Sequence, residues 1–242
     1  MHVHGRALRA LREEAYRGNM ALQLAGLVVG TFGNASAVDR AAGVVAIKPS
    51  GVSYDTLRPE NMVIVDLDGN VVEGTMRPSS DTRTHVRLYR AFEDVRGIAH
   101  THSLFATSWA QSQKPIPCLG TTHADYFHGP VPVTAVMRDA QIKLDYEYQT
   151  AEQILEAFRL QKIDYHGMPA VLVAAHGPFT WGATPVEAAF HSEMLEVVAE
   201  MAWLSLSIAP AAKGIKKTLL DKHYLRKHGK DAYYGQTAPT RA

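Results

Sequence analysis

Helical and strand patterns alternate along the whole chain without a linker between them. Residues 6–27 and 185–206 carry apolar side chains at helical spacing, and residues 44–48 and 62–66 are β-rich runs bounded by turn residues. Shorter signals predict a hairpin turn at 68–70 before a strand at 71–73, helices at 82–92, 108–112 and 141–160, and a strand at 171–175. This mixed order favours one α/β sandwich domain over residues 1–242 rather than repeated parallel βαβ units.

Composition and charge narrow the class of protein. The 242 residues are 46% hydrophobic and 20% charged, which fits one globular domain with a full core. The net charge of +1 gives no reason to expect nucleic acid as a partner, and no run approaches the ~20 apolar residues of a membrane span. The basic cluster at 213–230 also contains leucines, so it predicts a helix with a solvated face. Cys118 is the only cysteine, which excludes an internal disulfide, and we expect it to be buried in a cytoplasmic protein.

Three histidines stand where strands are predicted to end. His100 and His102 are two residues apart behind an apolar approach, so on a strand both imidazoles leave the same face. His176 ends the predicted strand 171–175, directly before a Gly-Pro turn. Histidine is the commonest metal ligand, and the three together predict a divalent cation with an open coordination position.

Asp81 has two competing interpretations. It sits where the helix 82–92 begins, so its carboxylate is placed either to cap that helix or to join the histidines as a ligand.

Three short segments have the chemistry of phosphate-binding turns. Each combines small residues with backbone N–H groups and hydroxyl or amide donors, which bind anions at turns and helix N-termini. They are Gly33–Ser36 in a predicted turn, Lys48–Gly51 after a strand, and Ser79–Ser80 before a helix. Each alone is more often an ordinary turn or cap, and only the fold can bring them together.

Longer segments of the chain resemble the class II aldolase and epimerase family. The matching segments are 33–40, 47–52, 73–75, 78–82, 100–103, 120–127, 176–179, 219–229 and 232–236. Within the family, the chain is most similar to the 4-epimerases that act on a phosphorylated ketopentose, from about residue 7 to Gln236. The resemblance implies a three-layer α/β/α sandwich with a central mixed, mainly antiparallel sheet.

The same resemblance assigns roles to the candidate residues. It implies a zinc-type metal, with Mn²⁺ or Co²⁺ as alternatives and no nucleotide cofactor, held by Asp81, His100, His102 and His176. It places the substrate and its phosphate on Gly33, Asn34, Lys48, Ser50, Gly51, Ser79 and Ser80. Family aldolases have a catalytic Glu where this chain has Asp81, and the shorter Asp favours the epimerase.

The expected reaction is reversible cleavage of a carbon–carbon bond, because a divalent metal can stabilise the enediolate that cleavage leaves. Rotation of the aldehyde fragment before re-addition inverts one carbon without a redox cofactor. Similar epimerases use an Asp and a Tyr as proton donor and acceptor, and the matching residues here are Asp125 and Tyr234. The family's fourfold homotetramers complete each site with a neighbouring subunit, from which His223 is expected to reach the substrate.

Three rival functions differ from the epimerase in what they require. A class II sugar-phosphate aldolase would release its two fragments, and Asp81 and the C-terminal tyrosine motif argue against it. A non-catalytic binding module would not need the complete set of ligand and acid–base residues. A nicotinamide-dependent enzyme would need a Gly-x-Gly-x-x-Gly turn after the first strand, which this chain lacks.

Overall fold

The computed structural model describes residues 2–234 and is built around one seven-stranded sheet. The strand order is β4 (Val71–Glu73), β3 (Val63–Asp66), β2 (Val44–Ile47), β1 (Asn34–Asp39), β5 (Gly97–His100), β7 (Pro178–Gly182) and β6 (Ala170–Leu172). Each neighbouring pair of these strands is antiparallel. A parallel bridge joins Val133, which lies outside the strands, to Leu172 of β6. The expected mixed, mainly antiparallel sheet is thus antiparallel in all of its strand pairs, with a parallel bridge at Leu172.

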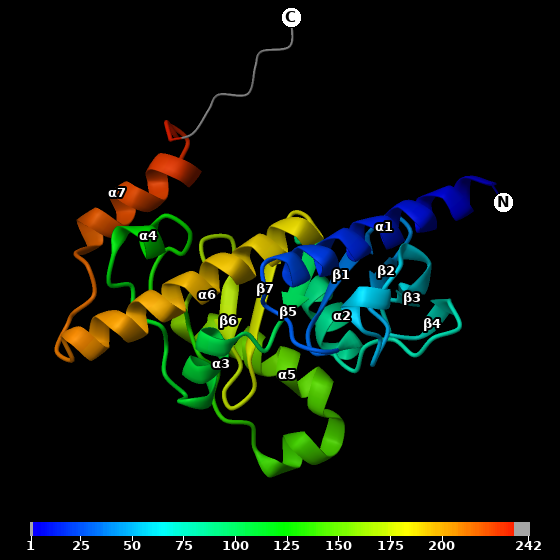
Figure 1. Cartoon of the computed structure of the whole chain (residues 1–242), viewed down its shortest axis with the longest axis horizontal. Coiled ribbons are helices and arrows are strands. Elements are labelled where there is room, and N and C mark those ends of the chain that lie inside the picture. The colour runs from blue at the N-terminus through cyan, green and yellow to red at the C-terminus, as the bar shows by residue number, and fades with distance from the viewer. Residues whose placement is uncertain (1, 235–242) are drawn as a thin grey trace, which may run out of the picture.

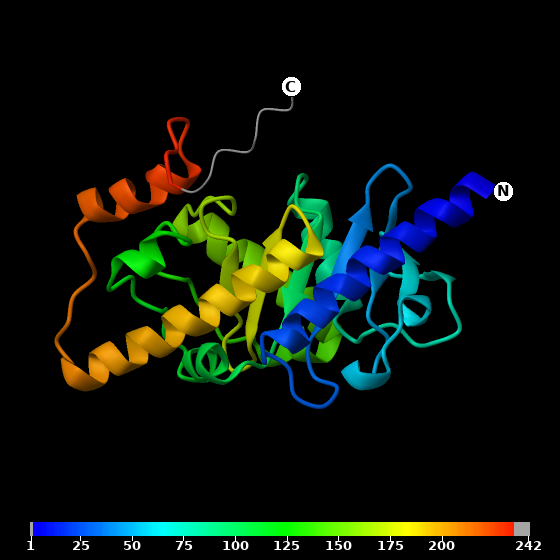
Figure 2. The same ribbon diagram turned by 45° about the horizontal axis from the view of Figure 1, so that its top comes forward.

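Helices cover both faces of the sheet and give the predicted three layers (Figures 1 and 2). Helices α1 (His2–Leu24) and α6 (Pro185–Ile208) lie across one face, where α1 packs on β1 and α6 packs on β5 and β7. Helices α2 (Thr82–Ala91) and α5 (Asp139–Gln161) pack together on the other face. The remaining elements are short: η1 (Tyr54–Thr56), η2 (Pro59–Asn61), α3 (Leu104–Gln111), α4 (Thr121–Ala124) and α7 (Lys217–His228).

Strand β1 shows how the sequence fills both layers. Ala35 and Ala37 pack into the apolar clusters on the α1 face. Ser36 points to the opposite face, where its hydroxyl hydrogen-bonds with His85 Nδ1 at 2.7 Å and Tyr89 Oη at 2.9 Å. Because alternate residues face opposite layers and both are covered, all four side chains from Ala35 to Val38 are buried.

Two local predictions were wrong. Asn34–Ser36 were expected in a turn but begin β1, because tertiary contacts rather than β-propensity hold this run of small residues extended. The strand expected at 171–175 ends at Leu172. Val173 N–H donates to Gly177 O and Ala175 adopts φ +59°, so the chain turns here and β7 starts at Pro178.

Buried Asn19 of α1 supplies one of the contacts that hold β1. Its Nδ2 donates to Ala35 O at 2.8 Å, and its Oδ1 accepts from Ala35 N at 2.9 Å. The ladder between β1 and β2 begins one residue later, at Ser36. Asn19 therefore satisfies the peptide groups that no neighbouring strand reaches, directly beside Asn34.

The C-terminal helix α7 lies beside α4 at the end of the molecule far from β4 (Figure 1). Cys118, in the segment before α4, is buried as predicted, and burial raises the pKa of its thiol to about 11. Among residues 2–234, we find no helix with the length and apolarity needed to cross a membrane. Gly235 and Gln236 of the C-terminal motif lie outside the described residues.

Candidate metal and phosphate site

One pocket of about 410 Å³ collects most of the candidate residues. Its walls come from the loop before β1, the loops after β2 and before α2, the end of β5, the β6–β7 turn and α5. The predicted residues that line it are Gly33, Asn34, Lys48, Ser50, Gly51, Ser79, Ser80, Asp81, His100, His102 and His176. The fold thus brings the three phosphate-type segments together with the three histidines.

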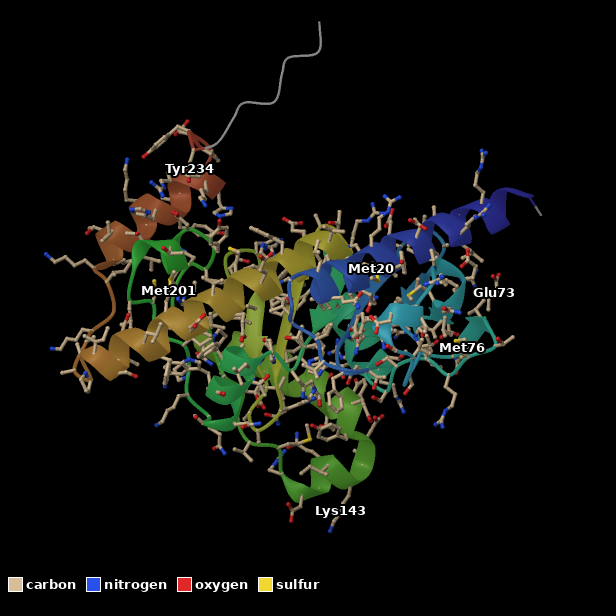
Figure 3. All side chains as sticks on the ribbon, viewed as in Figure 1. Met20, Glu73, Met76, Lys143, Met201 and Tyr234 are labelled. Carbon is tan, nitrogen blue, oxygen red and sulfur yellow. The ribbon has the colours of Figure 1, made fainter. Side chains whose placement is uncertain are left out.

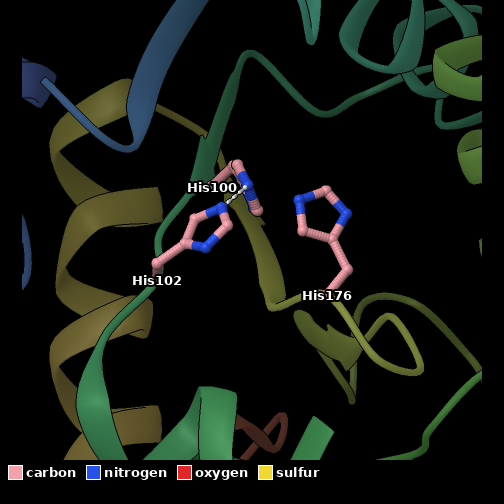
Figure 4. Close-up of side chains that lie close together, drawn as sticks. All are labelled: His100, His102 and His176. Carbon is pink, nitrogen blue, oxygen red and sulfur yellow. Dashed lines mark hydrogen bonds between the residues drawn. The ribbon is translucent and has the colours of Figure 1, made fainter. Parts of the chain in front are cut away.

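The three imidazoles converge at the ends of two neighbouring strands. His100 is the last residue of β5, His102 follows in the loop, and His176 lies in the β6–β7 turn. One nitrogen from each ring can be chosen so that all lie within 4.8 Å of one another, and His100 Nε2 is 3.0 Å from His102 Nε2 (Figure 4). His100 of β5 pairs with Phe179 of β7. This pairing places His176, three residues before Phe179, near the end of β5 where His100 lies.

The surroundings of His100 fix which of its nitrogens carries a proton. His100 Nδ1 lies 2.9 Å from Pro178 O, and a carbonyl oxygen can only accept a hydrogen bond. Nδ1 therefore holds the proton, and in the neutral ring Nε2 has a lone pair directed at the other histidines. The Phe179 ring stacks on His100 at 4.3 Å between centroids and holds the ring in this orientation.

Burial keeps the other two imidazoles neutral. Desolvation lowers the pKa of His102, and it lowers the pKa of His176 to about 3, with His100 nearby adding to the effect. Neutral rings with free lone pairs are the form in which histidine binds metals.

Asp81 does not cap helix α2. It occupies the N-cap position, but its carboxylate makes no capping hydrogen bond. Instead Oδ2 accepts from Asn34 Nδ2 at 2.6 Å and from Ser79 Oγ at 3.4 Å. Burial raises the pKa of this carboxyl, but the neighbouring imidazoles of His100 and His85 and the Asn34 hydrogen bond outweigh burial and lower it overall. Asp81 is thus an ionised group on the pocket wall.

The pocket also contains a buried lysine between small-residue loops. Lys48 is 1% exposed, and desolvation lowers its pKa to about 8. Its Nζ lies 3.3 Å from Thr31 O and 4.8 Å from the centre of the Tyr54 ring. A bridge between Pro49 and Pro78 places the loop 48–51 against the loop 79–80.

Gly33 and Asn34, which lead into β1 at the pocket, are each constrained by their surroundings. Gly33 has φ +79°, and a Cβ there would come within 2.9 Å of His100 O, so only glycine fits this approach. Asn34 Oδ1 is buried without a hydrogen-bond partner among the described residues. An orphaned acceptor on a pocket wall is satisfied most simply by a ligand hydroxyl.

Asp125, His223 and Tyr234 form a second group outside this pocket. His223 Nδ1 lies 3.0 Å from Asp125 Oδ1, and Arg226 donates to both carboxylate oxygens. The Tyr234 ring, at the end of α7 in Figure 3, lies 4.6 Å from the Arg226 guanidinium. None of the three predicted residues lines the histidine pocket of its own chain.

Sequence reasoning missed several residues of the pocket. Thr31 and Phe32 come from the loop after α1, and Tyr146 and Glu147 come from α5. The α5 residues gave no signal, because a polar aromatic in an amphipathic helix is indistinguishable from an ordinary half-buried one.

Comparisons with known proteins agree with this geometry. Residues 13–203 match the class II aldolase and adducin N-terminal domain family. The L-ribulose-5-phosphate 4-epimerase UlaF of Salmonella paratyphi B is 46% identical over 229 residues, which cover 95% of this chain and 100% of that protein. A protein of the same name from Salmonella choleraesuis has the same identity and coverage.

Solved structures show the same fold. An L-fuculose 1-phosphate aldolase has a TM-score of 0.75 at 25% identity, covering 90% of this chain and 96% of that protein. The L-fuculose-1-phosphate aldolase of Thermus thermophilus has a TM-score of 0.63 at 24% identity, covering 85% and 98%. With a family match over most of the chain and relatives 46% identical along their full length, this chain belongs to the class II aldolase and adducin N-terminal domain family.

Proposed function

We propose that this protein is an isomerase that interconverts L-ribulose 5-phosphate and D-xylulose 5-phosphate in the cytoplasm, by breaking and re-forming the C3–C4 bond. The observation that carries the proposal is the single pocket in which three imidazoles, a carboxylate and the small-residue loops meet. The substrate is taken from the name of the Salmonella relatives. The short Asp81 in place of the aldolase Glu supports epimerisation over net cleavage.

The donor set fits a divalent metal ion. Tetrahedral zinc with Zn–N bonds of about 2.0–2.1 Å separates its ligand nitrogens by roughly 3.3 Å, close to the 3.0 Å between His100 Nε2 and His102 Nε2. His176 supplies a third imidazole within 4.8 Å, and ionised Asp81 supplies a negative charge on the same pocket wall. Zn²⁺ suits this set, as do Mn²⁺ and Co²⁺. The chemistry supplied by such an ion is Lewis-acid polarisation of the substrate carbonyl.

The small-residue loops of the pocket hold the phosphate and the sugar hydroxyls. Lys48 contributes positive charge, and Ser50, Ser79 and Ser80 contribute hydroxyls on the pocket wall. The free Oδ1 of Asn34 accepts a hydrogen bond from a substrate hydroxyl, while its Nδ2 stays on Asp81.

Two proton-transfer groups are needed on opposite sides of C4. One takes the proton of the C4 hydroxyl as the C3–C4 bond breaks and C4 becomes an aldehyde carbon. After the aldehyde rotates, the other returns a proton to its oxygen as the bond re-forms. We assign these roles to Asp125 and Tyr234. Arg226 and His223 hold Asp125 ionised. Burial raises the pKa of this carboxyl, but the hydrogen bonds from these two residues lower it by a larger amount.

Because Asp125 and Tyr234 lie outside the pocket of their own chain, a neighbouring copy has to supply them. We therefore include in the proposal a homotetramer with sites at its subunit interfaces, in which His223 also reaches the neighbour's pocket. The exposed apolar side chains of α6, including Met201, Trp203 and Leu204, provide surface for such contacts.

A single assay tests the reaction. Metal-loaded protein is incubated with L-ribulose 5-phosphate, and formation of D-xylulose 5-phosphate is followed before and after chelation. Conversion that stops on chelation and returns with zinc supports the proposal. Release of dihydroxyacetone and glycolaldehyde phosphate without conversion would instead identify an aldolase.

Subunit mixing tests the shared site. The variants Asp125→Asn and His176→Ala are each expected to be inactive as pure tetramers. Unfolded and refolded together in equal amounts, they regain up to about one quarter of wild-type activity, because random assembly pairs an intact Asp125 with a neighbour's intact His176. Mixed assemblies that form but remain inactive would contradict a site built from two subunits.

A further inference from the structure

His176 makes a contact from α5 that the proposed reaction does not use. The hydroxyl of half-buried Tyr146 lies 3.2 Å from His176 Nδ1. We propose that Tyr146 is a positioning residue for the metal: its oxygen accepts the Nδ1 proton of His176 and so turns Nε2 towards His100 and His102. This inference rests on the metal-dependent function proposed above, and its test is independent of turnover.

The orientation of the His176 ring supports this role. Figure 4 shows one nitrogen of His176 facing the other two rings and the second nitrogen facing away. Since Nδ1 is occupied by Tyr146, the nitrogen that faces the cluster is Nε2. A neutral imidazole has one donor and one acceptor nitrogen, so a proton held on Nδ1 leaves the lone pair on Nε2. Tyr146 acts on His176 as the Pro178 carbonyl acts on His100.

Tyr146 is itself held firmly at the pocket wall. Helix α5 is interrupted at Asp145, where the backbone has φ −164° and ψ 83°. On one side of Tyr146, Asp145 Oδ2 pairs with Arg83 Nη1 at 2.8 Å; on the other, Glu147 O accepts from Thr84 Oγ1 at 2.7 Å. Both partners lie in the first turn of α2.

The contacts of Asp145 and Glu147 with α2 connect Tyr146, and through it His176, to the segment that carries Asp81. The first turn of α2 directly follows Asp81, so these two contacts attach the segment 145–147 to the segment that carries Asp81. His176 lies in the β6–β7 turn. Among the described residues, Tyr146 is the hydrogen-bond partner of its side chain. The Tyr146 hydroxyl therefore fixes the third imidazole relative to the carboxylate wall, which is the geometry that metal binding requires.

The test is the affinity for Co²⁺ alone, measured with metal-free protein. The variant Tyr146→Phe keeps the ring and removes only the acceptor, and we expect Co²⁺ to bind at least about tenfold more weakly, with altered visible absorption bands. The control is Tyr148→Phe, the same change two residues along α5, where the side chain lines a separate arginine-rich pocket. Its affinity and spectrum should match the wild type. A Tyr146→Phe affinity within about twofold of wild type, with an unchanged spectrum, would overturn the proposal.

A second variant covers the case in which Tyr146→Phe disturbs folding, seen as a lower unfolding temperature without metal. Thr84→Val breaks the attachment of Glu147 but leaves the Tyr146 ring in place, so a smaller loss of Co²⁺ affinity is expected, and unchanged affinity counts against the role. Wild-type protein that binds Co²⁺ but does not convert L-ribulose 5-phosphate would defeat the proposed function while the affinity comparison still decides the role of Tyr146. Wild-type protein that binds no Co²⁺ would defeat both.

Discussion

The side-chain amide of Asn34 donates to Asp81 Oδ2 at 2.6 Å. This bond joins the first residue of β1 to the residue that precedes α2, so it connects the phosphate-type segment 33–36 with the segment 79–80. The amide oxygen on the other side of Asn34 stays unpartnered among the described residues. Asn34 is thus placed to bind substrate and orient a carboxylate at the same time.

Asn34→Ala should raise the KM for L-ribulose 5-phosphate by about two- to tenfold, since its Oδ1 accepts from a neutral substrate hydroxyl and such a hydrogen bond contributes roughly 0.5–1.5 kcal/mol. Steady-state kinetics at saturating zinc measures it. Asn70→Ala is a matched control, because Asn70 also donates to an aspartate, Asp66 at 3.0 Å, but in the β3–β4 hairpin. Equal KM values for the two variants would count against Asn34 as a substrate contact.

Metal removal should lower the thermal stability of the protein as well as its activity. A ligand that binds only the folded state stabilises it by about 2.7 kcal/mol at a hundred times its Kd. The unfolding temperature of chelated protein is therefore expected to rise with added Zn²⁺, and the rise should shrink in His176→Ala. Differential scanning calorimetry over a zinc series checks this, and equal shifts in the two proteins would argue against the cluster as the binding site.

The histidine cluster could be predicted from the sequence because it depends on local signals, and the protein class could be predicted from the family resemblance along the chain. His100 and His102 follow an apolar strand, and the antiparallel pairing of β5 with β7 brings in His176. The expected placement of these histidines at the ends of strands was partly wrong, since His102 and His176 lie in loops beyond their strands. Histidines at strand ends remain close to one another whether the strand stops one residue early or late.

Other parts of the site depend on tertiary contacts that leave no periodic signal. Strand β1 was missed because Asn34–Ser36 are small residues without β-propensity, and Asn19 of helix α1 completes the hydrogen bonding of Ala35. Tyr146 was missed because the interruption at Asp145, which directs it into the pocket, depends on Arg83 and Thr84 of another helix. Asp125 and Tyr234 were chosen only through the family resemblance, and their roles stay predictions.

Acid should destabilise the fold partly through His123. Burial lowers its pKa from 6.5 to about 4, while its Nε2 donates to Gly129 O at 2.8 Å. A histidine with a depressed folded-state pKa takes up its proton in the unfolded state first, so stability falls as pH drops from 6.5 towards 4, by up to about 3 kcal/mol in all. In His123→Gln the dependence of the unfolding free energy on pH should be shallower over this range, as urea titrations would measure.

His166 gives the opposite dependence and serves as a control for His123. Its two nitrogens lie 2.8 Å from Asp164 Oδ1 and 2.6 Å from Asp94 Oδ2, and these carboxylates raise its pKa. A raised histidine pKa gives stability that is present below pH 6.5 and is lost as pH rises through the folded-state value. His166→Gln should therefore lose stability mainly at acidic pH. The same sign of change in both variants would show that the pH dependence comes from other groups.

Asn19→Ala should cost about 3 kcal/mol of unfolding free energy, although Asn19 touches no part of the pocket. The change leaves the buried N–H and C=O of Ala35 without partners, and each such group costs about 1–3 kcal/mol. Gln23→Ala, one turn along α1, removes an exposed hydrogen bond to Asp55 and should change the unfolding free energy by less than about 0.5 kcal/mol. Urea denaturation with the m-value held in common measures both.

Because Ala35 follows Asn34, we also expect Asn19→Ala to raise the KM at temperatures where the protein is still folded. A destabilised variant with an unchanged KM would show that β1 keeps Asn34 in place without this contact.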